Sequence, residues 1–144
     1  MPKPPVPEHV QDFLREPHPA VMATVKPDGS PHTAVTWYDW VDGRALVSMD
    51  VSRVRLRYLR SDPRVSLTVV ERGNWYRAAT ILGRAELHDD EGLVDIDRIA
   101  QRYTGARYVD RVRERVSAWI EPEQWYAWDA TAAAPKDEAA DTAM

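Results

Sequence analysis

The sequence contains no cysteine, which excludes a disulfide framework, a thiol nucleophile and a thiolate metal site. No apolar run approaches the length that spans a membrane, and the proline-rich residues 1–7, followed by Glu8, do not have the pattern of a signal peptide. We therefore expect a cytoplasmic protein without membrane contact. The four histidines have no zinc-motif spacing, so no metal site is expected.

The chain also has little excess charge and almost no phenylalanine. Its net charge is −4 over 144 residues, and residues 130–144 contribute −2 of this, so the remaining body argues against wholesale nucleic-acid binding. A hydrophobic content of 44% and a charged content of 29% are typical of one globular domain. One phenylalanine stands against six tryptophans and six tyrosines, whose amphipathic rings suit core edges, interfaces and planar ligands.

Alternating apolar and polar residues predict a mainly β fold. About six strands are expected, over residues 20–26, 32–41, 44–49, 64–70, 75–88 and 118–129, the last interrupted at Pro122. Short turns rich in glycine, aspartate and asparagine join most of them into antiparallel hairpins, which favours a barrel with short flanking helices. Gly83, in the middle of the longest run, predicts a bulge or a close backbone approach.

Helical patterns flank these strands. Apolar spacing predicts helices over residues 8–16, 89–105 and about 107–116. The predicted organisation is a proline-rich extension at residues 1–7, one barrel domain at residues 8–129, and a disordered, acidic, alanine-rich tail at residues 130–144.

The stretch from Ser48 to Arg64 carries five arginines and predicts a further helix, with Ser52 as its N-cap and Asp62-Pro63 as its end. Arg55 falls within the apolar arc of that helix, where no carboxylate at helical spacing can pair with it. A buried arginine needs either a carboxylate from elsewhere in the fold or a bound anion. Two other interpretations stay open, a merely solvated arginine face and a half-buried strand.

The order of these segments resembles the pyridoxamine-5′-phosphate-oxidase-like split β-barrel family, and within it the actinobacterial branch of flavin and deazaflavin oxidoreductases that use coenzyme F420. The resemblance covers residues 8–129 and is carried by VMATV (21–25), PDGSPH (27–32), VTWY (35–38), LVSM (46–49), LRSDPRVSL (59–67), LGRAEL (82–87) and PEQW (122–125).

The resemblance implies a homodimer with the cofactor in a groove between its subunits. It implies hydride transfer between reduced F420 and a small electron-poor organic acceptor, with the phosphate held by the arginine-rich helix. The cofactor-binding residues that it implies are His32, Val35, Thr36, Trp37, Ser48, Met49, Ser52, Arg53, Arg55, Trp75 and Tyr76. A ligand phosphate would also supply the partner that Arg55 requires.

Alternatives remain at this point. FMN would use the same arginines in an oxidoreductase of the pyridoxamine-phosphate-oxidase type. A non-catalytic carrier of the cofactor or of haem, or a structural homodimer, would fit the same fold. No catalytic residue is identified, and Tyr38, Tyr76 and Tyr126 are the tyrosines considered as proton donors.

Overall fold

A computed structural model describes residues 1–135 as a mainly β domain. Its elements are, in chain order, α1 (Glu8–Arg15), β1 (Ala20–Val25), β2 (Pro31–Thr36), β3 (Asp39–Val41), β4 (Arg44–Asp50), α2 (Val54–Ser61), β5 (Arg64–Glu71), β6 (Asn74–Asp89), the short 3-10 helix η1 (Glu91–Leu93), α3 (Val94–Thr104), β7 (Arg115–Asp129) and the 3-10 helix η2 (Thr131–Ala133).

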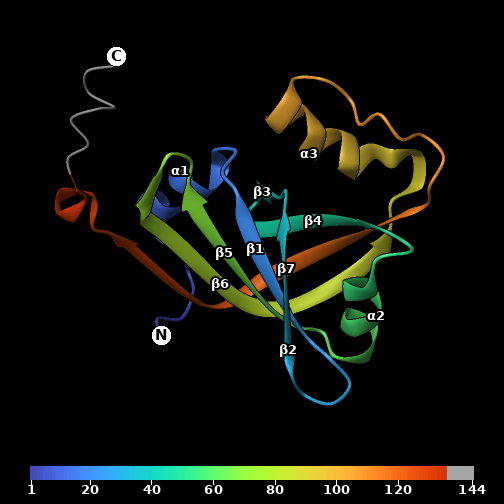
Figure 1. The fold of residues 1–144 in the computed structure, drawn as a ribbon, viewed down its shortest axis with the longest axis horizontal. Coiled ribbons are helices and arrows are strands. Elements are labelled where there is room, and N and C mark those ends of the chain that lie inside the picture. The colour runs from blue at the N-terminus through green and yellow to red at the C-terminus, as the bar shows by residue number, and fades with distance from the viewer. Residues whose placement is uncertain (136–144) are drawn as a thin grey trace.

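The seven strands form one antiparallel sheet in the order β2-β1-β5-β6-β7-β4-β3. Its two edge strands, β2 and β3, are consecutive in the chain and are joined by Trp37-Tyr38. The sheet therefore curls into a barrel that stays split between these edges (Figure 1). This confirms the predicted fold class, although the expected single strand over residues 32–41 is two strands, because β2 pairs with β1 and β3 with β4.

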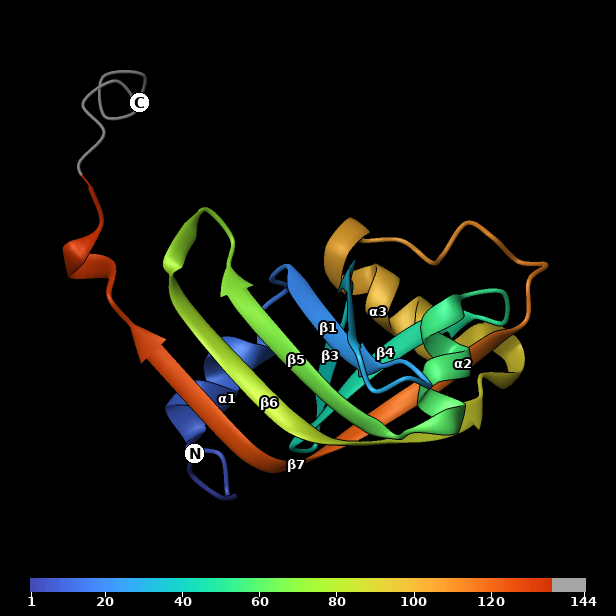
Figure 2. The ribbon, with the colours of Figure 1, turned by 60° about the horizontal axis from the view of Figure 1, so that its bottom comes forward.

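The long strands β6 and β7 pair along most of their length and form one wall of the barrel (Figure 2). Their register shifts between Leu82 and Gly83, where Gly83 faces Pro122. A Cβ atom on Gly83 would lie 2.2 Å from the backbone oxygen of Glu121, so the predicted close approach is confirmed. Pro122 lies within a continuous β7 at this bulge, which corrects the expected interruption.

Two of the three helices predicted outside the arginine stretch are found in the structure, and the third is not. The first is α1, and the second is α3, whose start is capped by Asp90 and whose end is Gly105 at φ 74°. The carboxylate of Asp90 accepts hydrogen bonds of 2.9 Å from two backbone N–H groups of the first turn of α3. The third helix, over residues 107–116, is wrong, because the chain there is an irregular loop that leads into β7 at Arg115.

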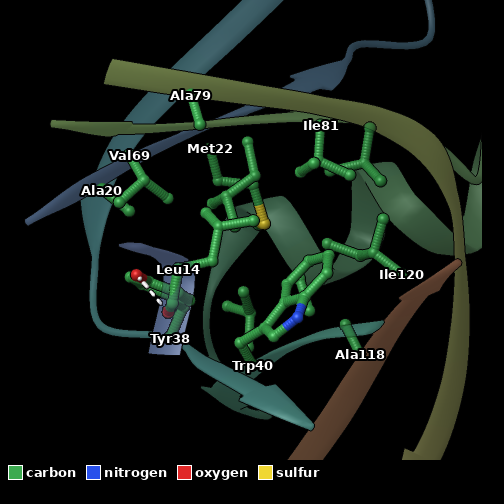
Figure 3. Packing of buried hydrophobic residues seen from close by; sticks show 14 of the residues in the cluster. Leu14, Ala20, Met22, Tyr38, Trp40, Val69, Ala79, Ile81, Ala118 and Ile120 are labelled. Atoms are coloured by element: carbon green, nitrogen blue, oxygen red, sulfur yellow. Dashed lines mark hydrogen bonds between the residues drawn. The ribbon is translucent and has the colours of Figure 1, made fainter. Parts of the chain in front are cut away.

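The core fills the barrel and extends under α1 (Figure 3). Alternate residues of the strands, such as Met22 and Ile81, point inwards and belong to the same core cluster as Leu14 of α1. Tyr38 is fully buried, and its hydroxyl donates a hydrogen bond of 2.7 Å to the backbone oxygen of Leu14. Burial raises the pKa of Tyr38 far above its ordinary value.

Both ends of the described chain lie against the barrel. Near the N-terminus, the backbone oxygens of Pro2 and Lys3 accept hydrogen bonds of 3.0 and 3.1 Å from the backbone and indole N–H groups of Trp125. The tail was predicted to lack structure from residue 130, but η2 forms at its start and Ala130 bonds to Tyr76. The rest of the predicted tail, residues 136–144, lies outside the described residues. Among residues 1–135, no helix is long and apolar enough to cross a membrane.

Candidate functional site

A cavity of about 500 Å³ opens where the edge strand β2 approaches β4, beside α2 and α3. It is lined by His32, Ala34, Val35, Thr36, Trp37, Ser48, Arg53, Val54, Arg55, Ile96, Ile99, Tyr108 and Arg115. These residues come from β2, β4, the start of α2, α3, the loop after α3 and the start of β7. The curling of the sheet is therefore what brings the site together.

Seven of the eleven residues predicted to bind the cofactor line this cavity: His32, Val35, Thr36, Trp37, Ser48, Arg53 and Arg55. The four others do not. Met49 is fully buried in the core, because neighbouring residues of β4 point to opposite faces and Ser48 takes the cavity side. Trp75 and Tyr76 lie near the β5–β6 turn and do not line the cavity of their own chain.

Ser52, the fourth of these residues, has a different role from the one expected. The helix α2 begins after Arg53, whose side chain does not cap it. The hydroxyl of Ser52 bonds instead to the carboxylate of Asp50, which also accepts a hydrogen bond of 2.9 Å from the Ser52 backbone. Asp50 therefore shapes the turn before α2, and the uncapped, positive end of that helix faces the cavity through Arg53 and Val54.

Arg55 is half-buried in the cavity wall and forms no ion pair within residues 1–135, although the charge of Asp50 acts on it from nearby. Its Nη2 donates a hydrogen bond of 3.4 Å to the backbone oxygen of Ser48, and its Nε has no partner among residues 1–135. Burial lowers the pKa of Arg55, and the neighbouring guanidinium groups of Arg53 and Arg115 lower it further. The prediction of a helix rather than a strand is confirmed by α2. The position of Arg55 on the inner side of that helix, predicted from its place in the apolar arc, is also found in the structure.

Arg115 is a further cation of the site that the sequence did not identify. Its Nε donates a hydrogen bond of 2.9 Å to the hydroxyl of Ser48, and its guanidinium lies 4.7 Å from the ring centre of Tyr108. Both residues lie in the segment for which a helix was wrongly predicted, so neither was assigned to the site. Asp97 holds this loop in place, because its carboxylate pairs with Arg111 and accepts the backbone N–H of Tyr108.

Aromatic rings form another part of the cavity wall, and Tyr108 joins them to the arginines through its contact with Arg115. Trp37 stacks on Tyr103 with the ring centres 5.1 Å apart and the planes 5° from parallel. Tyr108 meets the same tryptophan edge to face at 6.3 Å. Ile96 and Ile99 add apolar wall from α3. The cavity thus has a flat apolar side and a cationic side, which suits a planar ring that carries an anionic group.

The charges of the cavity fit a phosphate-bearing cofactor. Three arginines line it, and no aspartate or glutamate is among its lining residues in the described part of the chain. Guanidinium groups bind phosphate oxygens through paired N–H donors, so Arg53, Arg55 and Arg115 would hold such a group. The unpartnered Nε of Arg55 is the donor that an anion would satisfy.

Comparisons with known proteins give a family and several similar structures. A family model described as pyridoxamine 5′-phosphate oxidase matches residues 6–129. An F420 reductase is 25% identical, with a TM-score of 0.76 over 84% of this chain and 98% of its own. The conserved hypothetical protein Rv2991 from Mycobacterium tuberculosis is 26% identical, with a TM-score of 0.74 over 94% of this chain and 92% of its own.

One further structure shares the fold at lower identity. It is a FAD and heme binding protein from Mycobacterium smegmatis, 19% identical, with a TM-score of 0.67 over 98% of this chain and 78% of its own. No functionally curated protein matches the sequence.

Proposed function

Because the chain belongs to the pyridoxamine 5′-phosphate oxidase family, we propose that it is an oxidoreductase that uses coenzyme F420 to reduce a small electron-poor organic acceptor. The family resemblance drawn from the sequence is confirmed by the family match, and the similar structures include an F420 reductase. The observation that carries the proposal is Arg55, a half-buried cation that faces the cavity without an acidic partner in residues 1–135.

The cationic side of the cavity would bind the phosphate of the cofactor. Arg55 and Arg53 lie at the start of α2, and Arg115 reaches the same place through Ser48. F420 carries a phosphodiester and a polyglutamate tail, so several cations near one another suit it. Guanidinium forks and the positive end of a helix act together here, as at other phosphate sites.

The apolar side would hold the ring of the cofactor and the acceptor. Bound F420 supplies a hydride in its reduced form, and the protein contributes position and water exclusion. Val35, Thr36 and Trp37 come from the edge of the sheet, where backbone groups are free to meet a ring edge. The stack of Trp37 on Tyr103 keeps that wall flat and rigid.

We also propose that the protein is a homodimer in which a second copy covers the cavity mouth. Val35, Val21, Thr68, Thr80 and Tyr126 are directly opposed in register across five strands, so they share one face of the sheet. The three large members are exposed, at 78% for Val35, 38% for Val21 and 50% for Tyr126. Three large, exposed side chains on one face of the sheet support a protein contact.

Val35 belongs both to this row and to the cavity lining, so a copy docked on the row would close the site. Trp75 and Tyr76, which stay away from the cavity of their own chain, would then complete the cavity of the other copy. Trp75 is 74% exposed and is free to do so.

FMN is the second candidate cofactor, because the same three arginines would bind its single phosphate. Titration of F420 and of FMN into the cofactor-free protein, each followed by fluorescence, separates the two. The proposal expects tighter binding of F420, and it expects Arg55→Met to weaken that binding about tenfold to a hundredfold, from the ~1.5–3 kcal/mol of a hydrogen bond to a charged group. Protein that is purified yellow with tightly bound FMN, and that ignores F420, would overturn the choice of F420.

A further inference from the structure

His32, which the family resemblance implies as a cofactor contact, is a cavity residue to which the proposed function assigns no specific role. It lines the cavity from β2, and its ring meets that of Tyr58 on α2 edge to face, with centres 5.4 Å apart. Its Nδ1 is buried and has no hydrogen-bond partner among residues 1–135. Nε2, at the tip of the ring, is the other nitrogen through which His32 can exchange a proton.

A second unpartnered polar atom lies opposite it. Thr24 on β1 is paired directly with His32 on β2, so the two side chains share one face of the sheet. Thr24 is 2% exposed, and its Oγ1 has no partner among the described residues. The Cβ atoms of directly opposed residues in antiparallel strands lie about 4.5–5.5 Å apart, so a small rotation or one water joins hydroxyl and imidazole.

Two orphaned buried groups on one cross-strand pair call for an explanation, since each alone carries a cost. We propose that His32 is the proton donor to the acceptor and that Thr24 is its positioning residue. The threonine hydroxyl engages Nδ1 and fixes the orientation and tautomer of the ring, which leaves Nε2–H directed at the cavity. This assignment rests on the proposed function of the site.

The other groups around the cavity do not compete for this role. Arg53, Arg55 and Arg115 hold their protons at any physiological pH. Tyr108 is the one tyrosine that lines the cavity in the described chain, and Arg115 covers its ring. Imidazole both releases and recovers a proton near neutral pH, which a phenol does not.

The step is a proton transfer coupled to reduction. The donor is the doubly protonated ring of His32, whose Nδ1–H is donated to the threonine hydroxyl. Its Nε2–H bond breaks as a bond from that proton to the oxygen, nitrogen or carbon of the acceptor forms, and His32 is left as the neutral imidazole. The electron pair comes as hydride from the reduced deazaflavin of the proposed function, which is oxidised. Solvent returns a proton to His32 after the product leaves. Among residues 1–135, the charged and titratable groups that line the cavity with His32 are the three arginines and Tyr108, and Tyr58 on α2 contacts its ring.

The first test needs no cofactor. Long-range ¹H–¹⁵N NMR of the free protein reports the tautomer and hydrogen bonding of each imidazole, and His32→Gln assigns the signals of His32. We expect Thr24→Val, which replaces the hydroxyl with a methyl group of similar size, to shift these signals, and Thr24→Ser to restore them. His88→Gln, at an exposed histidine paired with Glu86, is the matched control and leaves them unchanged. Identical spectra for wild type and Thr24→Val would refute the Thr24–His32 pair.

The second test is turnover with reduced F420. We expect His32→Gln to lower kcat about 10²- to 10⁴-fold with little change in the binding of F420, and to remove the fall in kcat at high pH that loss of the acid proton causes in wild type. Thr24→Val should lower kcat less, and Thr24→Ser should recover it. Wild-type turnover with full activity in His32→Gln would overturn this inference and leave the proposed function standing. Absence of any F420 binding or turnover would remove the proposed function, while the NMR result would still decide the Thr24–His32 pair.

Discussion

The charge of Arg55 forms no ion pair within the described residues of the fold. Its guanidinium is half-buried, one of its N–H donors lacks a partner in residues 1–135, and two other arginines face it. Such a group lowers stability in the unliganded protein, and it persists where binding requires it. Substitution of Arg55 therefore distinguishes a role in binding from a role in stability, because the two roles predict opposite effects on the free energy of unfolding.

We expect Arg55→Met to leave the free energy of unfolding of the cofactor-free protein unchanged or to raise it by about 1 kcal/mol, because an unsatisfied buried donor costs about 1–3 kcal/mol. Urea unfolding measures this, and Arg60→Met, on the exposed side of the same helix, is the control. A loss of more than about 1 kcal/mol in Arg55→Met alone would mean that the arginine holds the fold together.

Asp50 is the residue through which pH acts on the turn before α2. Hydrogen bonds from the hydroxyl and the backbone N–H of Ser52, aided by Arg53 and Arg113, hold the pKa of its carboxyl below the ordinary value, although burial opposes them. A carboxyl whose pKa is lowered by folding stabilises the protein above its unfolded pKa of about 3.9, and this contribution is lost as pH falls through the folded pKa.

We expect Asp50→Asn to lower the free energy of unfolding at pH 7 by about 1.5–3 kcal/mol, the range for hydrogen bonds to a charged group. The difference from wild type should shrink as the pH is lowered below 4, since the wild-type carboxyl becomes neutral there. Urea unfolding at a series of pH values checks both statements. A difference that stayed constant down to pH 2 would show that the charge of Asp50 does not stabilise the turn.

At the scale of elements, the β6–β7 pair sets the shape of the barrel wall, and Gly83 sets the shape of the pair. The bulge there accommodates Pro122 and brings the Glu121 backbone against Gly83. We expect Gly83→Ala to lower the free energy of unfolding by about 1–3 kcal/mol, the usual cost of overpacking. The added Cβ would clash with the backbone oxygen of Glu121, which can move away only if the paired strand shifts.

Thermal unfolding measures this effect, with Glu86→Ala on the exposed side of β6 as the control, expected within about 0.5 kcal/mol of wild type. If Gly83→Ala melted at the wild-type temperature, the close approach of the two strands would be absent in solution.

Elements with strong local patterns were predictable from the sequence, and elements fixed by distant contacts were not. The strands around the Pro27–Ser30 and Asp42–Gly43 turns follow local alternation and turn residues. The loop after α3 has helical spacing of Tyr108, Val112 and Val116, but the carboxylate of Asp97 ties it down from 11 and 14 residues away. No local pattern contains that contact, so the helix was predicted there and the cavity residues Tyr108 and Arg115 were missed.

The residues of the site also fall into those that the sequence predicts and those that it does not. Arg55 is marked in the sequence by its place in the apolar arc of the arginine-rich stretch, whereas Ser48, Arg53 and the β2 residues were reached through the family resemblance. The burial of Met49 could have been predicted, since strand alternation places it on the face opposite Ser48. The pairing of Thr24 with His32 needed the strand register, which the sequence does not state.

At the scale of the whole molecule, the exposed row that includes Val35, Val21 and Tyr126 is the proposed contact between two copies. We expect light scattering to give twice the 16.5 kDa mass of the chain for wild type, and close to the single mass for Val35→Glu, because a buried unpaired charge in a dimer contact is costly. Val109→Glu, on the loop after α3 and 90% exposed, is the matched control and should remain a dimer. A monomeric wild type would contradict the proposed dimer and would leave Trp75 and Tyr76 without a place at the site.

The central claim is that this cavity binds F420 for hydride transfer, and turnover tests it most directly. Reduced F420 should be oxidised by the wild-type protein in the presence of an electron-poor acceptor, such as a conjugated enone, at a rate that rises with protein and acceptor concentration. Arg55→Met, folded and equally stable, should need much more F420 to reach the same rate. Turnover in Arg55→Met at the wild-type F420 dependence, or a wild-type protein that turns over a reduced flavin and never reduced F420, would contradict the account.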